Sequence, residues 1–161
     1  MKPSSFKFAL SLINSRFGDG YASAYFENDE LKEGFHLLSS DSAVLIYSPV
    51  ELHPKFYAHS KNALVLNVAA VQKNLQNTGK ASALLNGFHE QFSGHCDILI
   101  PLWYYEGSTN LQHWIQKKEG RLLASFNEYW KKESIEMAYV CLHCGAPPCL
   151  CRMDLYLLPR K

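Results

Sequence analysis

Residues 63–102 decide the fold, and they begin with Ala63-Leu64-Val65-Leu66-Asn67-Val68-Ala69-Ala70-Val71. This run is almost wholly apolar, which predicts a central β-strand buried on both faces. A polar loop, Gln72 to Gly79, follows it, and apolar residues then recur at helical spacing from Lys80 to Phe92. Residues 97–102 form a second apolar run. The stretch therefore predicts a parallel strand–helix–strand crossover.

The elements outside this crossover follow from capping residues, turn residues and hydrophobic spacing. In chain order we expect a helix from Ser4 or Ser5 to about Arg16, a short helix within Asp29–Leu38, a strand over Ala43–Tyr47, a helix capped by Thr109 that runs to about Lys118, strands from Arg121 onward, and a hairpin with arms Ile135–His143 and Cys149–Leu157. These elements alternate helix and strand, so they predict an α/β fold.

The composition is that of an ordinary globular domain: 161 residues, 47% hydrophobic and 19% charged, with a formal net charge of +1. This charge gives no general attraction to nucleic acid or to an anionic membrane, so we expect neither as a partner. The N-terminal residues lack the pattern of a signal peptide, and no apolar stretch approaches the ~18–20 residues of a membrane span. Five cysteines, four of them crowded into residues 141–151, do not make a secreted disulfide framework. We therefore expect one cytoplasmic domain over residues 1–161.

The loop before the crossover helix, Gln72 to Gly79, has the chemistry of an anion site. Where a helix begins, the first backbone N–H groups have no partner within the helix, and the helix dipole adds partial positive charge. Gly79 and Ala81 are small enough for a diphosphate to approach the backbone, and Lys80 adds a positive charge. Neither G-x-x-x-x-G-K-(S/T) nor G-x-G-x-x-G occurs in the chain, so two common phosphate-binding loops are excluded.

Gln76 to Ala81 has the pattern Q-x-x-G-x-A, which resembles the acyl-CoA signature (Q/R)-x-x-G-x-(G/A) of the GNAT superfamily of N-acetyltransferases. The surrounding register is similar to that family as well. Val71 stands five residues before Gln76, and Lys118 stands two residues before Gly120. The apolar run 153–157 resembles the family's last strand, so the resemblance covers about residues 43–158.

The resemblance implies a mixed, mostly antiparallel α/β (α+β) sheet with helices on both faces, and acetyl-CoA or another acyl-CoA held where the central strands splay apart. It implies that the loop backbone binds the pyrophosphate, that the pantetheine arm pairs with the end of the preceding strand, and that Asn110 lies on the pantetheine's other side. The cofactor-binding residues so predicted are Ala69, Val71, Gln76, Asn77, Thr78, Gly79, Lys80, Ala81 and Asn110. The implied activity is acetyl transfer to an amine, whose pocket in this family comes from the first helices and the late loops.

The chain departs from the family at the catalytic positions. Many members carry a tyrosine as general acid four residues before the glycine, and this position is Gln116 here. His113, Trp114, Tyr104 and Tyr105 are near in sequence, and the sequence does not choose among them. For the base, the strand offers Asn67 and its approach offers His59; we interpret Asn67 as a hydrogen-bonded core residue. The catalytic residues therefore stay undetermined at this point.

The segment Cys141-Leu142-His143-Cys144-Gly145-Ala146-Pro147-Pro148-Cys149-Leu150-Cys151 contains the C-x-x-C-G pattern of a zinc knuckle. Cys149 and Cys151 can complete a four-thiolate site with Cys141 and Cys144, and His143 is an alternative ligand. Two features stand against zinc: a C-x-C pair on a strand points both side chains to one face, and the short connection is unlike that of ordinary zinc modules. From the sequence we favour small apolar strand residues over a metal site, with a redox or disulfide role as a third alternative.

Three functions remain open at this stage. The first is an acyl-CoA-dependent N-acyltransferase whose partners are acyl-CoA and an amine. The second is a non-catalytic CoA-binding or regulatory protein on the same fold, which the glutamine at position 116 motivates. The third is a small zinc-stabilised interaction module that uses the predicted cysteine hairpin. A homodimer is an option that the sequence neither requires nor excludes.

Overall fold

The structure, a computed structural model, describes residues 3–103, 110–141 and 143–161. Its centre is a six-stranded sheet in the order β3-β4-β5-β6-β8-β7, in which β5 and β6 are parallel and the other neighbours antiparallel. The strands are β3 (His36–Ser39), β4 (Ala43–Pro49), β5 (Ala63–Val71), β6 (Asp97–Trp103), β7 (Arg121–Phe126) and β8 (Met153–Leu158). Two short strands, β1 (Phe26–Glu27) and β2 (Glu30–Leu31), form a separate ribbon.

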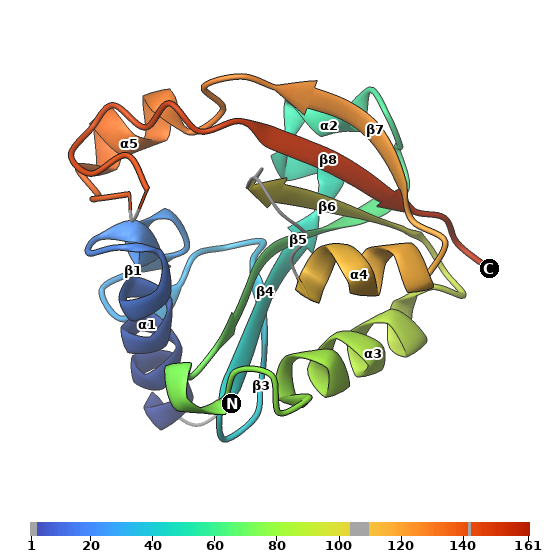
Figure 1. Ribbon diagram of the computed structural model, residues 1–161, viewed down its shortest axis with the longest axis horizontal. Helices are drawn as coiled ribbons and strands as arrows, with labels where there is room; N and C mark the ends of the chain where they lie inside the picture. The colour runs from blue at the N-terminus through green and yellow to red at the C-terminus, as the bar shows by residue number, and fades with distance from the viewer. Residues whose placement is uncertain (1–2, 104–109, 142) are drawn as a thin grey trace.

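Helices cover both faces of the sheet (Figure 1). They are α1 (Pro3–Phe17), α2 (Pro54–Tyr57), α3 (Lys80–Phe92), α4 (Asn110–Lys117) and α5 (Lys131–Met137), with 3₁₀ turns η1 (Tyr21–Ala24), η2 (Val50–Leu52) and η3 (Lys73–Leu75). On one face, Ile13 of α1 packs with Val44, Ile46 and Val68 of the sheet. On the other, α3 and α4 pack against β5 and β6. The mixed, mostly antiparallel sheet with its parallel crossover is therefore confirmed.

The predicted helix within Asp29–Leu38 is wrong. The chain there forms β2, a turn and β3, and Gly34 in the turn has φ +80°, which ends any regular helix. His36 pairs with Tyr47 of β4 across the sheet, and their rings stack. Cross-strand pairing outweighed the local helical spacing because it buries Leu37 in the core.

The predicted hairpin of Ile135–His143 with Cys149–Leu157 is also wrong. Its first arm begins with the last turn of α5 (Lys131–Met137) and contains no strand, and its second arm contains β8, which pairs with β6 and β7. Between α5 and β8 the described residues form neither helix nor strand, apart from a bridge between Cys141 and Gly145. β8 lies between β6 and β7, and this position buries its mostly apolar residues on both faces of the sheet.

The two halves of the sheet diverge at β5 and β6 (Figure 1). Their pairing is limited to Ala63 with Asp97, Leu64 with Ile98 and Val65 with Leu99. Two residues later β5 has an irregular register with β4, in which Leu66 pairs with Tyr47 and Val68 with Ile46. Asn67 is therefore the extra residue of a β-bulge, and a bulge bends its strand. The bend directs the end of β5 away from β6.

No residue of β5 is exposed, although the strand is not uniformly buried as expected. Asn67, Ala69 and Val71 are half-buried, and all three border the opening between the strands. In the described part of the chain, no helix is long and apolar enough to cross a bilayer.

Candidate active site

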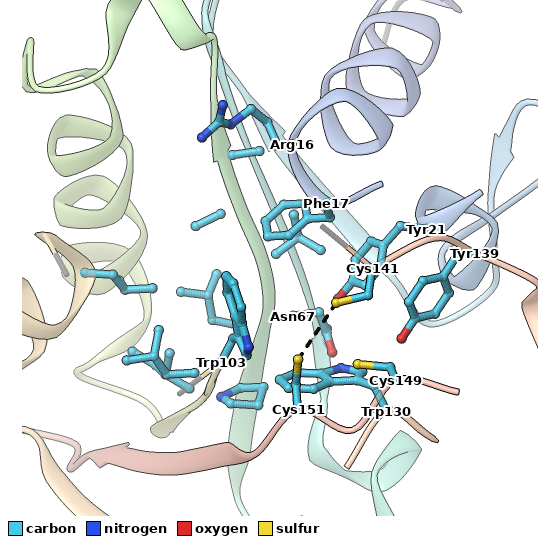
Figure 2. Close-up of a pocket in the computed structure, with 18 of the residues that line it drawn as sticks. Arg16, Phe17, Tyr21, Asn67, Trp103, Trp130, Tyr139, Cys141, Cys149 and Cys151 are labelled. Atoms are coloured by element: carbon cyan, nitrogen blue, oxygen red, sulfur yellow. Dashed lines mark hydrogen bonds between the residues drawn. The ribbon is translucent and has the colours of Figure 1, made fainter. Parts of the chain in front are cut away.

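A cavity of about 390 Å³ lies where β5 and β6 separate (Figure 2). Residues 66–71 of β5 form one side of it and residues 100–103 of β6 form another. The end of α1, η1 and the segment after α5 close it from the other direction, with Tyr21, Tyr139 and Cys141 among the lining residues. The cavity exists because the two strands stop pairing after Val65 and Leu99.

The edge of β5 that faces this cavity is free for hydrogen bonding to a ligand. On its other edge β5 stays paired with β4 as far as Val71, which pairs with Ala43. On the cavity side no described strand pairs with β5 beyond Val65. A strand edge with unpaired N–H and C=O groups can bind an extended chain as an added strand. Ala69 and Val71 lie on this part of β5, so their predicted pairing with a pantetheine arm stays a prediction that the geometry permits.

The loop that follows β5 ends as an open helix N-terminus. Gly79 is the N-cap of α3 and has φ +83°, which a residue with a side chain rarely adopts. Thr78 holds the turn, because its Oγ1 donates a hydrogen bond to the carbonyl oxygen of Leu75 at 2.6 Å. A Cβ added at Gly79 meets no heavy atom within 4 Å. The first N–H groups of α3 thus face open space, as an anion site requires.

The predicted cofactor residues lie together along one path. Ala69 and Val71 at the end of β5 and Gln76 in the following loop all line the cavity. Asn77, Thr78, Gly79 and Lys80 are exposed and Ala81 is half-buried. Asn110, the first residue of α4, donates a hydrogen bond to Asn77. A ligand that spans the cavity and the α3 N-terminus would contact all nine positions or their neighbours, which stays a prediction.

Of the positions suggested for a general acid, those within the described residues do not line the cavity. His113 and Gln116 are exposed on α4, and neither lines the cavity. Trp114 is buried beneath α3, where its Nε1 donates to Oδ1 of Asn86 at 2.9 Å. Tyr104 and Tyr105 lie outside the described residues.

Of the two residues suggested for the base, only Asn67 lines the cavity; His59 is exposed beyond α2. Nδ2 of Asn67 donates to Oγ of Ser48 at 2.8 Å and to the carbonyl oxygen of Val65 at 3.2 Å. Oγ of Ser48 in turn lies 2.8 Å from Nε2 of His53, and burial lowers the pKa of His53 to about 4. The neutral His53 ring can accept a hydrogen bond from the Ser48 hydroxyl, so this chain of hydrogen bonds fixes the Asn67 side chain. The hydrogen bonds expected of Asn67 are therefore present, but the residue is half-buried at the cavity and does not lie in the core, where the sequence predicted it.

Two tyrosines at the cavity were missed by the sequence analysis. Tyr139 is 3% exposed, and its hydroxyl has no hydrogen-bond partner among the described residues. Its ring packs edge-on against Tyr21 with centroids 5.1 Å apart, and burial raises the pKa of both phenols. Both hydroxyls therefore stay protonated at neutral pH and can donate hydrogen bonds. No local pattern marks these residues, because they meet only through the packing of α5 against η1.

The clustered cysteines gather at one end of the cavity, and Figure 2 shows the three that line it, Cys141, Cys149 and Cys151. Their Sγ atoms all lie within 4.8 Å of one another. Cys141, Cys149 and Cys151 border the cavity, whereas Arg16 lies at its opposite end in this view. The alternative ligand His143 is not part of the group; its ring is exposed and packs against Trp103.

Solved structures with the same architecture identify the fold. The ribosomal-protein-S18-alanine N-acetyltransferase of Escherichia coli superposes with a TM-score of 0.63 at 12% identity, over 100% of this chain and 91% of that chain. This chain has the GNAT fold. NAA60 of Arabidopsis thaliana in complex with acetyl-CoA gives a TM-score of 0.67 at 11% identity, over 98% and 94% of the two chains. An IAA acetyltransferase from Bacillus cereus gives 0.58 at 16% identity, over 92% and 89%.

The GNAT fold is thus shared at a level of identity that sequence comparison does not detect. No family model matches the sequence, and no curated protein matches it. The fold predicted from Gln76–Ala81 and its flanking elements is confirmed by these structures. The sequence pattern did not indicate that the cysteine cluster and the pair Tyr21 and Tyr139 lie at the cavity of this fold.

Proposed function

We propose that this chain is an acyl-CoA-dependent N-acyltransferase that moves an acetyl group from acetyl-CoA to an amine. One observation carries the proposal: the cavity between β5 and β6 extends to Gln76, three residues before Gly79, the N-cap of the open α3 N-terminus. Acetyl-CoA carries a thioester at one end and a pyrophosphate farther along the molecule, so its thioester fits the cavity and its pyrophosphate fits the N-terminus of α3. The complexes of NAA60 with acetyl-CoA and with a bisubstrate analogue, which have this fold, support the same reading.

The reaction forms a bond between the amine nitrogen and the acetyl carbon and breaks the carbon–sulfur bond, so that one proton passes from the amine side to the thiolate side. The chain contributes mainly by holding the two reactants in contact in a largely apolar cavity. Backbone N–H groups on the free edge of β5 between Ala69 and Val71 are the donors suited to the developing oxyanion. The phenols of Tyr21 and Tyr139 in the cavity wall are protonated and can supply the proton to the leaving thiolate.

The acceptor side favours an amine carried on an apolar or aromatic group. Phe17, Tyr21, Trp103 and Trp130 line the cavity, and Arg16 is the one charged side chain among its described lining residues. Oδ1 of Asn67 can accept a hydrogen bond from the amine, because both bonds that fix this side chain use its Nδ2. Asn67 is therefore proposed to orient the acceptor.

Binding and turnover test the proposal separately. Acetyl-CoA at 100 times its Kd should stabilise the chain by about 2.7 kcal/mol, seen as a rise in Tm, and calorimetry should give one site. Mass spectrometry of products from a panel of arylalkyl amines and peptide N-termini should then show acetylation that depends on the chain. Absence of both a Tm shift and calorimetric binding at millimolar acetyl-CoA would refute the proposal.

A second candidate, a non-catalytic CoA-binding protein, is favoured by Gln116. This residue replaces the tyrosine that many GNAT enzymes carry, and it is exposed away from the cavity. Binding of acetyl-CoA with no acetylation of any amine in the panel would select this candidate over the enzyme.

A further inference from the structure

We propose that Cys141, Cys144, Cys149 and Cys151 bind one zinc ion, which fixes the chain between α5 and β8 as a wall of the cavity. The proposal reverses the preference drawn from the sequence, which favoured unligated core cysteines. It concerns metal binding by the folded chain and does not rest on the proposed transferase function.

The positions of the sulfur atoms match a tetrahedral site. Zinc–sulfur bonds of about 2.3 Å in a tetrahedron place the sulfurs about 3.8 Å apart. Sγ of Cys141 lies 3.8 Å from that of Cys151, and Sγ of Cys144 lies 4.0 Å from that of Cys149 and 3.3 Å from that of Cys151. All of the sulfur pairs are within 4.8 Å. Shifts of about an ångström or less therefore complete the tetrahedron.

The backbone around the first two cysteines has the form of a knuckle. Cys141 and Gly145 exchange two backbone hydrogen bonds of 2.9 and 2.8 Å, and Gly145 adopts φ +80° to close the turn. The N–H of Cys144 points to Sγ of Cys141 at 3.5 Å, and the N–H of Leu150 points to Sγ of Cys144 at 3.4 Å. Such donors stabilise thiolate charge, as the outer shell of a metal site does.

The objection raised by the sequence disappears in the structure. A C-x-C pair on a strand would put both side chains on one face and hold them in line. Residues 149–151 precede β8 and are not part of a strand, so Cys149 and Cys151 can approach the ion from different directions. The short connection is sufficient because the turn at Gly145 brings the two cysteine pairs face to face.

A structural ion explains how an irregular segment is held against the cavity. The described residues between α5 and β8 contain no helix or strand, and few backbone bonds secure them. The N–H of Cys149 donates to Oγ of Ser134 in α5 at 2.8 Å, and the N–H of Val140 donates to the carbonyl oxygen of Asp19 at 3.2 Å. Four bonds to one zinc ion would join these contacts and fix Tyr139, two residues before the first ligand. Binding releases the thiol protons as the thiolates form.

The test uses the full chain purified under reducing conditions without chelator. Metal analysis should give about one zinc per chain, and X-ray absorption should give four sulfur neighbours at about 2.3 Å. Cobalt substitution should produce the visible bands of a tetrahedral thiolate site. Less than about a tenth of an equivalent after incubation with zinc would overturn the proposal. A disulfide among these cysteines in the freshly reduced and desalted chain would overturn it as well.

A matched pair of variants locates the site. Cys144→Ser should reduce zinc to well below one equivalent, whereas Cys96→Ser should retain one equivalent, because Sγ of Cys96 contacts the carbonyl oxygen of Phe92 outside the cluster. Equal zinc content in the two variants would overturn the assignment. If Cys144→Ser does not fold, the cobalt spectrum of the wild type tests the proposal instead, and a spectrum without the bands of tetrahedral thiolate ligation would overturn it. Acetyl-CoA binding is measured in parallel by calorimetry. A chain that binds zinc but not acetyl-CoA supports the zinc site and refutes the transferase. A chain that binds acetyl-CoA but not zinc supports the transferase and refutes the zinc site.

Discussion

Nδ2 of Asn110 donates a hydrogen bond of 2.5 Å to Oδ1 of Asn77, and this bond joins the first residue of α4 to the loop before α3. The two residues are 33 positions apart in sequence, and both were assigned to the cofactor on separate grounds. Asn77 has φ +62°, a left-handed conformation that asparagine tolerates better than most residues. The bond therefore ties the position of the loop before α3 to that of α4.

Asn110→Ala should weaken acetyl-CoA binding about three- to tenfold, because the loop loses a positioning bond and the cofactor loses a neighbouring amide. Stability should change by less than about 0.5 kcal/mol, since both asparagines are exposed. Calorimetry measures the Kd, and the exposed Asn127→Ala serves as the control. An unchanged Kd would remove Asn110 from the cofactor site.

Gly79→Asp should reduce acetyl-CoA affinity by at least about tenfold, because a carboxylate at the N-terminus of α3 repels a pyrophosphate. Gly79→Asn has almost the same shape and also tolerates the positive φ, so it should lose much less affinity. Tm should be similar in the two variants, because a Cβ at this position meets no atom within 4 Å. Equal losses of affinity would show that size, and not charge, matters here.

The unfolding free energy should fall by about 2–3 kcal/mol between pH 6.5 and pH 4 owing to His53. Burial lowers the folded-state pKa of this residue to about 4, whereas the unfolded chain titrates near 6.5. In that window the unfolded state binds the proton and the folded state does not, so stability decreases as the pH falls. Urea unfolding at several pH values measures the effect. His53→Gln removes the titration, and an equal slope in this variant would contradict the assignment.

Gly18→Ala should destabilise the chain by about 3 kcal/mol or more. A Cβ at this position would lie 1.6 Å from the carbonyl oxygen of Val140, and φ is +114°. Gly87→Ala in α3 is the control, because its Cβ meets nothing within 4 Å and alanine should add about 0.5–1 kcal/mol of helix stability. Urea unfolding compares the two, and a Gly18→Ala chain as stable as wild type would mean that Val140 does not pack on this turn.

Ser134→Ala should cost about 1–3 kcal/mol, because the buried N–H of Cys149 loses its acceptor. If the cysteines bind zinc, the same change should weaken zinc affinity about tenfold or more, since this bond supports a ligand. Tm with and without added zinc and a competition titration with a chelator measure the two effects. The exposed Ser82→Ala should change neither quantity, and a Ser134→Ala chain that behaves the same way would contradict the role of this bond.

Local signals were sufficient for the crossover and insufficient after α4. From Ala63 to Phe92 the apolar run, the glycine and the helical spacing agree, so β5 and α3 were predicted with the bounds that they have. In α5 the residues are mostly polar, and Ile135 is 58% exposed, so no apolar stripe distinguishes the helix from a strand. Tyr139 and Val140, shortly after α5, are positioned by contacts with residues 18–21, more than a hundred residues earlier.

The sequence by itself determined the strand–loop–helix–strand unit and predicted an anion site at Gln76–Ala81, because both inferences depend on residues close together in the chain. Tertiary structure alone decided the cavity. The bulge at Asn67 and the end of β5–β6 pairing at Val65 arise from registers between different strands. The convergence of four cysteines beside Tyr21 and Tyr139 arises from the packing of α5 on η1. Burial of apolar surface across the whole fold fixes these contacts, and no short stretch of sequence contains that information.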